Sequence, residues 1–266
     1  MTQPGPSQDD VRRVWNANAD FWDDKIGNGN DFQIELIEPA TEKLLGDVAG
    51  LAILDVACGA GRFGRRMAQL GANVLGIDFS EKFIERAKSR TPAEMRNIEY
   101  RVADATNKDQ LLSLGEGRFD GAVATMALMD MTTIDPLMDS LPFLLKPKGW
   151  FIFSIMHPCF QPAGLTKFAE SIESAGTWEV VKGVKISHYL TPTAWQGIGI
   201  LGQPETQYYF HRSLQDIFNT AFRNGFVIDG FEEPGFKEAP QDDRYLRWKH
   251  LTEIPPVLIV RVRLAT

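Results

Sequence analysis

The amino-acid sequence predicts an α/β protein with a mostly parallel sheet. Between residues 51 and 155, short apolar runs alternate with helical patterns, which is typical of strand–helix–strand units. A glycine-rich turn at 59–64 (GAGRFG) directly follows the first of these runs. Near the C-terminus, two apolar runs have no helical pattern between them, and this predicts an antiparallel pair of strands.

The composition is that of an ordinary globular protein. The 266 residues are 44% hydrophobic and 24% charged, so dominant disorder is not expected. With 28 basic and 35 acidic residues, the net charge of −7 argues against a nucleic-acid partner. No stretch approaches the roughly 18 apolar residues of a membrane span, and the first residues lack an apolar signal-peptide core. We therefore expect a cytoplasmic protein with no membrane partner.

The cysteine and histidine pattern predicts no metal site and no disulfide framework. Cys58 and Cys159 are the two cysteines, too few for either a set of disulfides or a four-thiolate metal site. No cluster of His, Asp, Glu and Cys has metal-ligand spacing. We interpret Cys58, inside the glycine-rich segment, as a small packing residue.

Two helices are expected before the first strand. Ser7 and Asp10 have capping-box spacing, and they precede an amphipathic pattern with an aromatic stripe that includes Trp15 and Trp22. A second helix is expected at about 33–45, ending at Gly46.

The alternating segment predicts five strands and the helices between them. The strands are expected at 51–57, 73–78, 98–103, 119–125 and 150–155. Helices are expected at 62–70, at 80–89 with Ser80 as its cap, and after residue 125 up to about 145. The segment 146–149 (KPKG) is read as a breaker between the last helix and the last strand.

The pattern changes after residue 157. The segment 158–207 is rich in proline and glycine, and we interpret it as an inserted cap in which 178–181 and 184–189 form an antiparallel pair. A helix is expected at 213–224, followed by strands at 226–231 and 257–264.

The glycine-rich turn predicts a site for an adenosine-type cofactor. Glycines allow the backbone to approach a ligand at the first strand–helix junction, where the helix N-terminus offers free N–H groups. Asp78 lies about 20 residues after Gly59, where a carboxylate can accept the ribose hydroxyls. Asp55 would repel the phosphates of a dinucleotide but suits S-adenosylmethionine (SAM), whose ammonium and sulfonium are cationic. Asp104 can accept from the adenine amino group or cap a helix.

At these motifs, residues 51–155 resemble a class I SAM-dependent methyltransferase of the small-molecule, UbiE-like type. The glycine motif, the acids at 78 and 104 and the segment 144–150 (LLKPKGW) carry the resemblance. It implies a Rossmann-like, seven-stranded sheet of order 3-2-1-4-5-7-6 with strand 7 antiparallel. The sequence departs from the glycine-rich pattern at Ala57 and Cys58. The cofactor-binding residues expected from the motifs and the resemblance are Asp55, Ala57, Gly59, Gly61, Asp78, Phe79, Asp104, Ala105, Trp15 and Trp22.

This reading divides the chain into three parts. Residues 1–46 form N-terminal helices over the cofactor site, 47–157 and 208–266 form the SAM-binding core, and 158–207 form a substrate cap inserted after strand 5. His157, directly after the fifth strand, and His211, expected to open the last helix, are the candidate catalytic bases. Asp130 could line the site after strand 4, but a helix cap is the favoured interpretation.

The cap is expected to hold the methyl acceptor. Its aromatic and apolar content favours a small, largely apolar or aromatic metabolite, with a histidine and three aromatic residues as candidate contacts: Trp195, Tyr208, Tyr209 and His188. The predicted activity is methyl transfer by in-line displacement, an EC 2.1.1 type of reaction. An NAD(P)-dependent oxidoreductase and a catalytically inactive SAM-binding module are the alternatives. A homodimer is kept as a candidate assembly.

Overall fold

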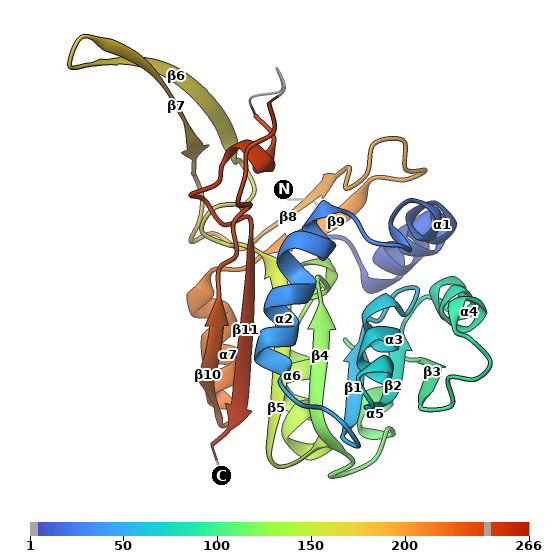
Figure 1. Ribbon diagram of the computed structural model, residues 1–266. Helices are drawn as coiled ribbons and strands as arrows, with labels where there is room; N and C mark the ends of the chain where they lie inside the picture. Colours follow the sequence, from blue (N-terminus) through green and yellow to red (C-terminus); the bar gives the residue numbers. More distant parts are fainter. Residues whose placement is uncertain (1–4, 242–245, 266) are drawn as a thin grey trace.

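The computed structural model describes residues 5–241 and 246–265, and its centre is a seven-stranded sheet (Figure 1). The strands lie in the order β10-β11-β5-β4-β1-β2-β3, and β11 is antiparallel to both of its neighbours. This is the predicted order and the predicted antiparallel strand. The bounds are β3 (Ile98–Val102), β2 (Asn73–Asp78), β1 (Ala52–Val56), β4 (Phe119–Thr125), β5 (Leu145–Met156), β11 (Val257–Leu264) and β10 (Phe226–Glu232).

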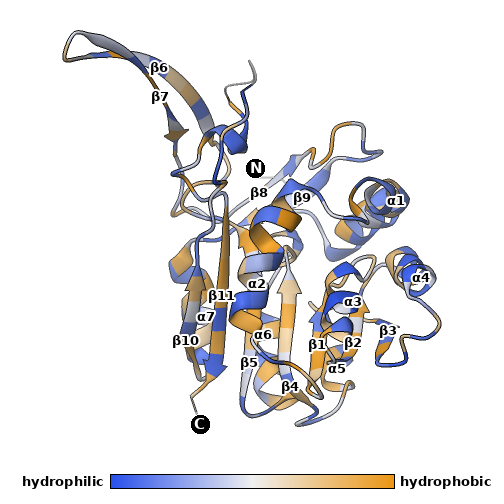
Figure 2. Cartoon of the chain, in the orientation of Figure 1, coloured by the Kyte–Doolittle hydropathy of each residue, from blue (hydrophilic) through white to orange (hydrophobic). Residues whose placement is uncertain are grey.

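Helices cover both faces of the sheet. Alternate strand residues point to opposite faces, so Ile53 and Leu54 of β1 belong to two separate apolar cores. The Ile53 core packs against α2 (Glu38–Leu45) and α3 (Arg62–Gln69). The Leu54 core lies on the opposite face of the sheet. It packs against α5 (Lys108–Leu112), α6 (Asp135–Leu144) and α7 (Leu214–Arg223). Figure 2 shows the hydrophobic strands between these two layers.

The N-terminal helices agree with the sequence. Helix α1 (Gln8–Ile26) begins at Ser7 with the predicted capping box to Asp10. The second predicted helix begins as a π-helical segment, η1 (Phe32–Ile37), continues as α2 and ends at Gly46, whose φ is 68°. Helix α4 (Glu81–Arg90) has Ser80 as its cap and packs against α1.

The expected breaker at 146–149 was wrong, because these residues lie inside β5. Phe119 of β4 pairs with Leu145, and Gly121 pairs with Trp150, so the intervening residues of β5 form an irregular bulge. Lys148 there has a φ of 63°. A proline and a glycine are tolerated at such a bulge because the ladder resumes on both sides of it.

The inserted segment contains two hairpins, and the predicted strand pair was wrong. The expected partners 178–181 and 184–189 overlap the same strand, β7 (Thr177–Lys185), which pairs with the unpredicted β6 (Thr166–Ser174). This ribbon projects away from the body of the protein (Figure 1). Without a buried face it has no hydrophobic alternation from which its register could be predicted.

The second hairpin joins the insertion to the core. It consists of β8 (Thr193–Gly197) and β9 (Gln207–His211), so the expected boundary at 207/208 falls inside it. His211 ends β9 and does not open a helix. Helix α7 begins after Ser213, which makes a second capping box with Asp216.

The buried side chain of Asn18 joins α1 to the β8–β9 loop. Its amide nitrogen donates to the Glu205 carbonyl at 2.9 Å, and its amide oxygen accepts from the Glu205 N–H at 2.9 Å. We expect Asn18→Ala to lower the free energy of unfolding by about 1–3 kcal/mol, because both backbone groups lose their partner. Asn73→Ala, which removes an exposed 3.3 Å bond, is the control in urea denaturation. Equal effects of the two substitutions would contradict this role of Asn18.

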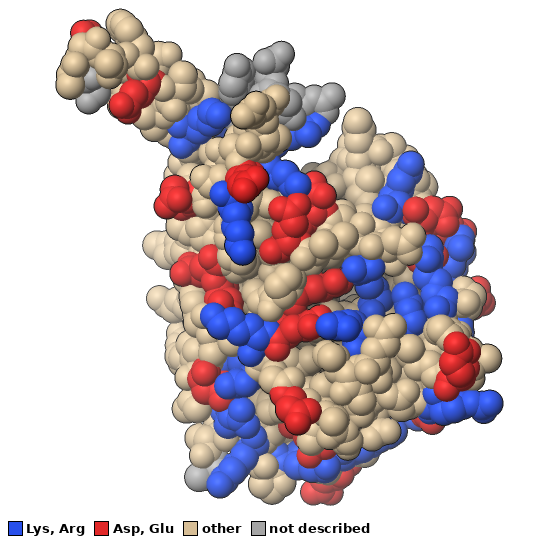
Figure 3. All heavy atoms as spheres, in the orientation of Figure 1, with Lys and Arg blue, Asp and Glu red and all other residues tan. Residues whose placement is uncertain are grey.

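Charges of both signs are interspersed on the face of the molecule drawn in Figure 3. Within residues 5–241 and 246–265, no helix combines the length and the hydrophobicity that crossing a bilayer requires.

Candidate functional site

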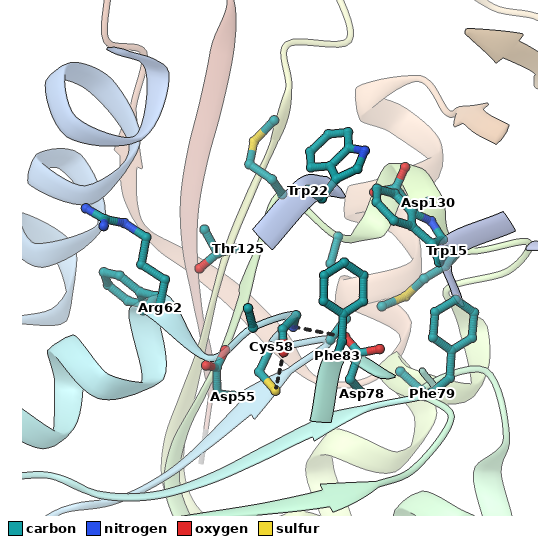
Figure 4. Close-up of a pocket in the computed structure, with 18 of the residues that line it drawn as sticks. Trp15, Trp22, Asp55, Cys58, Arg62, Asp78, Phe79, Phe83, Thr125 and Asp130 are labelled. Atoms are coloured by element: carbon teal, nitrogen blue, oxygen red, sulfur yellow. Dashed lines mark hydrogen bonds between the residues drawn. The ribbon is translucent and has the colours of Figure 1, made fainter. Parts of the chain in front are cut away.

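A cavity of about 210 Å³ lies at the carboxyl ends of the parallel strands β1, β2 and β4. This is where open α/β sheets bind ligands. Helix α1 covers the cavity with Trp15 and Trp22 (Figure 4). Nine of the ten expected cofactor residues line it: Trp15, Trp22, Asp55, Ala57, Gly59, Asp78, Phe79, Asp104 and Ala105. The tenth, Gly61, is not part of the lining.

The glycine-rich turn allows close packing behind the cavity. Gly59 and Gly61 have φ angles of 53° and 74°, which glycine adopts without steric cost. A side chain at Gly61 would overlap the Tyr100 ring, and a Cβ at Gly64 would lie 2.8 Å from Asp55 Oδ2. The glycines therefore let α3 approach β1 and leave the cavity open.

Backbone strain is concentrated at the same strand ends. Ala57 after β1 and Met126 after β4 have φ angles of 52° and 53°, although neither is a glycine. Both line the cavity. Such strain often occurs at functional sites, where the surrounding structure holds it in place. At Ala57, where the sequence departs from glycine, an alanine therefore adopts the left-handed backbone conformation that glycine adopts without strain.

Asp78, at the end of β2, organises the turn. One carboxylate oxygen accepts the Gly59 N–H at 2.9 Å, and the other accepts the Ser80 N–H at 2.9 Å. Burial raises the pKa of Asp78 to about 6, against the effect of these two hydrogen bonds. Each oxygen retains a lone pair that a ribose hydroxyl can use.

Asp55, at the end of β1, is buried and only partly satisfied. Its Oδ2 has no hydrogen-bond partner of good geometry among the described residues, although the backbone N–H of the neighbouring Gly64 lowers the pKa of the group. Burial, and then the neighbouring charge of Asp78, raise the pKa of Asp55 to about 7. Burial and the same two carboxylates raise the pKa of the Cys58 thiol, which disfavours the thiolate form that a nucleophile needs.

Asp104, after β3, is held by the N-terminal helix. Its carboxylate accepts from Arg12 at 2.8 Å and from Gln8 at 3.3 Å, and the Thr106 N–H donates to it at 2.8 Å. It does not cap the next helix, because Asn107 caps α5. Asp104 therefore fixes α1 over the cavity.

The candidate catalytic histidines lie outside the lining of this cavity. The ring of His157 is buried, with Nε2 2.7 Å from Glu233 Oε1 and with Nδ1 accepting the Cys159 N–H at 3.2 Å. This pattern places the His157 proton on Nε2, and burial lowers the pKa of the ring. His211 Nε2 lies 2.6 Å from the Tyr189 carbonyl. Both rings have structural partners, and their catalytic role stays a prediction.

The expected acceptor residues are dispersed. Trp195 and Tyr209 stack across the β8–β9 hairpin with ring centroids 5.3 Å apart, and Trp195 borders a second, smaller cavity of about 30 Å³. Tyr208 packs against the α1 aromatic cluster, and His188 is exposed. None of these four residues lines the larger cavity, so their contact with the acceptor stays a prediction.

The interpretation of Asp130 as a helix cap was wrong. Asp130 ends a short 3₁₀ helix, η2 (Leu128–Asp130), and it lines the larger cavity, whereas α6 begins only at Asp135. Thr125, at the end of β4, also lines the cavity and was not expected from the sequence. Their position in the sequence was the available signal, because Thr125 ends the parallel strand β4 and Asp130 lies five residues after it. In the described part of the chain, no group of three or more His, Cys, Asp or Glu side chains could hold a metal ion.

Comparisons with known proteins agree with this geometry. A family model described as a methyltransferase domain matches residues 54–153. A ubiquinone biosynthesis O-methyltransferase from Caulobacter vibrioides is 30% identical over 78% of this chain and 90% of its own length. The relative of the same name from Bordetella avium is 29% identical, and there the match spans 54% of this chain and 56% of the relative.

A solved structure has the same fold over nearly its full length. The SAM-dependent methyltransferase from Mesorhizobium loti is 30% identical, with a TM-score of 0.62, and the match covers 85% of this chain and 96% of that protein. The strand order, the glycine-rich turn with its two acids and these likenesses agree with one another. This chain therefore belongs to the family of class I SAM-dependent methyltransferases.

Proposed function

We propose that the chain transfers the methyl group of SAM to a small, largely apolar or aromatic metabolite. The observation that supports this most directly is the pair of buried acids at the ends of β1 and β2, which both line the cavity and one of which has an unpartnered oxygen. Burying two carboxylates away from water costs free energy unless a cation or a hydrogen-bond donor contacts them. SAM fits, because it carries two cations and a ribose diol.

In this proposal each wall of the cavity has its own role. Asp78 accepts the ribose hydroxyls, Asp104 and Ala105 border the adenine, and Asp55 faces a cationic group. The Gly59–Gly61 turn and Ala57 give backbone contacts. Trp15 and Trp22, whose ring centroids lie 5.1 Å apart, exclude water together with Phe79.

When bound, SAM supplies a methyl group on a positively charged sulfur, which is a good leaving group. The protein has mainly to place the acceptor in line with that methyl group and keep water out. The apolar walls of the cavity suit both tasks. Oxygen is the accepting atom that the names of the curated relatives favour.

Calorimetry tests the choice of cofactor. We expect S-adenosylhomocysteine (SAH) to bind with measurable heat and NADH to give none. The reverse result would favour the oxidoreductase reading. Turnover on a panel of small acceptors separates an active enzyme from an inactive SAM-binding module, since both bind SAH.

We further propose a cytoplasmic homodimer that takes no nucleic-acid substrate. The β6–β7 ribbon supports the dimer, because it exposes apolar side chains on both faces: Trp178 and Val180 on one, Ile172 and Val181 on the other. A two-stranded ribbon alone is marginally stable in water, and a second copy would cover it. The net charge of −7 disfavours nucleic acid.

Trp178→Lys is expected to shift the protein from dimer to monomer in sedimentation velocity at micromolar concentration. The indole is 73% exposed, so the substitution leaves the fold of one chain intact. Leu201→Lys, at a side chain 89% exposed in the other hairpin, is the matched control. A wild-type protein that sediments as a monomer throughout would refute the dimer.

A further inference from the structure

Asp130 occupies the wall of the cavity opposite the two cofactor acids. Figure 4 shows Asp130 and Trp22 on one side, with Asp55 and Asp78 on the other. Asp130 Oδ1 is buried and has no hydrogen-bond partner within residues 5–241 and 246–265. A buried carboxyl oxygen without a hydrogen-bond partner destabilises the fold, so this geometry points to a ligand group that forms a hydrogen bond with it.

The surroundings of Asp130 are flat and aromatic, with few donors. Trp22 Nε1 and Thr125 Oγ1 also line the cavity, and both are buried without a hydrogen-bond partner among the described residues. Trp15 packs against Trp22 and, with a centroid distance of 6.0 Å, against Phe83. Walls of this kind bind a planar molecule that bears one or two oxygen atoms.

The backbone that carries Asp130 is held in place by Arg212, which follows β9. Its guanidinium donates to the carbonyls of Leu128 at 3.0 Å, Met131 at 2.8 Å and Thr132 at 3.0 Å. These three bonds fix the backbone on both sides of Asp130. A catalytic group needs such fixed placement.

Building on the proposed function, we propose that Asp130 is the catalytic base and that the acceptor is a phenol or an enol. The acceptor O–H proton passes to Asp130 Oδ1 as the acceptor oxygen forms its bond to the methyl carbon. The carbon–sulfur bond of SAM breaks, and its electron pair stays on sulfur. The products are a methyl ether, SAH and a protonated Asp130, so the positive and the negative charge disappear together.

The acidity of the hydroxyl selects this class of acceptor. A carboxylate takes a proton more readily from a phenol or enol than from an aliphatic alcohol. An amine must be neutral to attack, and an adjacent carboxylate would keep it protonated. Burial and the Asp78 charge raise the pKa of Asp130 well above its usual range, so its ionised form is a stronger base and turnover should increase with pH as Asp130 loses its proton. Burial, and then the Asp130 charge, raise the pKa of Tyr209.

Binding of 4-nitrophenol to the SAH-loaded protein tests this role without turnover. In wild type we expect the bound probe to give its proton to Asp130 and to show the absorbance of the phenolate, because the raised pKa of Asp130 favours the proton on the carboxyl group. In Asp130→Asn no base takes the proton, so the bound probe should ionise only at a higher pH. 4-Nitroanisole, which has no O–H, should bind equally to both proteins.

Turnover gives the second measurement. With a phenol that the wild type methylates, Asp130→Asn should lower kcat by at least about 100-fold, while the Kd for SAH changes less than about threefold. Asp135→Asn, at an exposed acid outside the cavity, is the control. The inference is overturned if Asp130→Asn matches this control in spectrum and kcat, or if the SAH-loaded wild type binds no phenol. Failure of SAH itself to bind would instead refute the proposed function.

Discussion

Asp78→Ala is expected to raise the Kd for SAH at least about 100-fold. The carboxylate is proposed to accept two ribose hydroxyls, and charge-assisted hydrogen bonds contribute about 1.5–3 kcal/mol each. Together they account for a factor of at least about 100 in affinity. The substitution also leaves the Gly59 and Ser80 N–H groups without their acceptor, which loosens the turn that the cofactor contacts.

A matched substitution at the other end of the sheet separates binding from stability. Asp120, near the start of β4, also accepts a backbone N–H, from Ala52 at 2.8 Å, and it pairs with Lys146. It does not line the cavity. Asp120→Ala should therefore lower the melting temperature without changing the Kd for SAH in calorimetry. If Asp78→Ala binds SAH within about threefold of wild type, the assignment of the ribose site is wrong.

The core of the fold could be predicted from the sequence because its signals are local. The run 73–78 is largely apolar and lies between Gly71 and Ser80. In the structure, β2 covers the same residues, Asn73–Asp78. The glycine-rich turn and Asp78 lie about 20 residues apart because one helix and one strand separate them. Local patterns do not encode the order of the strands, and the family resemblance supplied it.

The insertion and the acceptor side of the cavity could not be predicted in the same way. The partner of His157 is Glu233, 76 residues away, so no pattern near His157 reveals that its ring is already bonded. Asp130 was interpreted as a cap because the start of the next helix could not be located. In the structure, residues 131–134 separate Asp130 from α6, and Asp130 lies in the short helix η2. Arg212, which follows the inserted segment in the sequence, donates a hydrogen bond to the carbonyl of the adjacent Met131.

The ionisation of Asp55 links the stability of the ligand-free protein to pH. The folded protein holds the Asp55 proton up to about pH 7, whereas the unfolded chain releases it near the ordinary value of 3.8. Between these values the folded state binds more protons, so the contribution of Asp55 to the free energy of unfolding falls as the pH rises. Above about pH 7 this loss is complete. A bound cation reverses the preference, since it favours the ionised carboxylate.

Asp55→Asn should therefore improve stability and impair binding. At pH 8 without ligand, we expect its free energy of unfolding to exceed that of wild type by about 1–3 kcal/mol, with little difference near pH 4. Its Kd for SAM should rise at least about tenfold at pH 8, where the wild-type carboxylate is ionised. Between pH 6.5 and 8 the wild-type affinity should increase and that of the variant should stay constant. Urea denaturation and calorimetry at each pH measure these effects. A variant that is less stable than wild type at pH 8 would show that the pKa of Asp55 is not raised in the ligand-free protein. A variant that keeps the wild-type pH profile for SAM would show that Asp55 faces no cation, because the neutral amide does not ionise over this pH range.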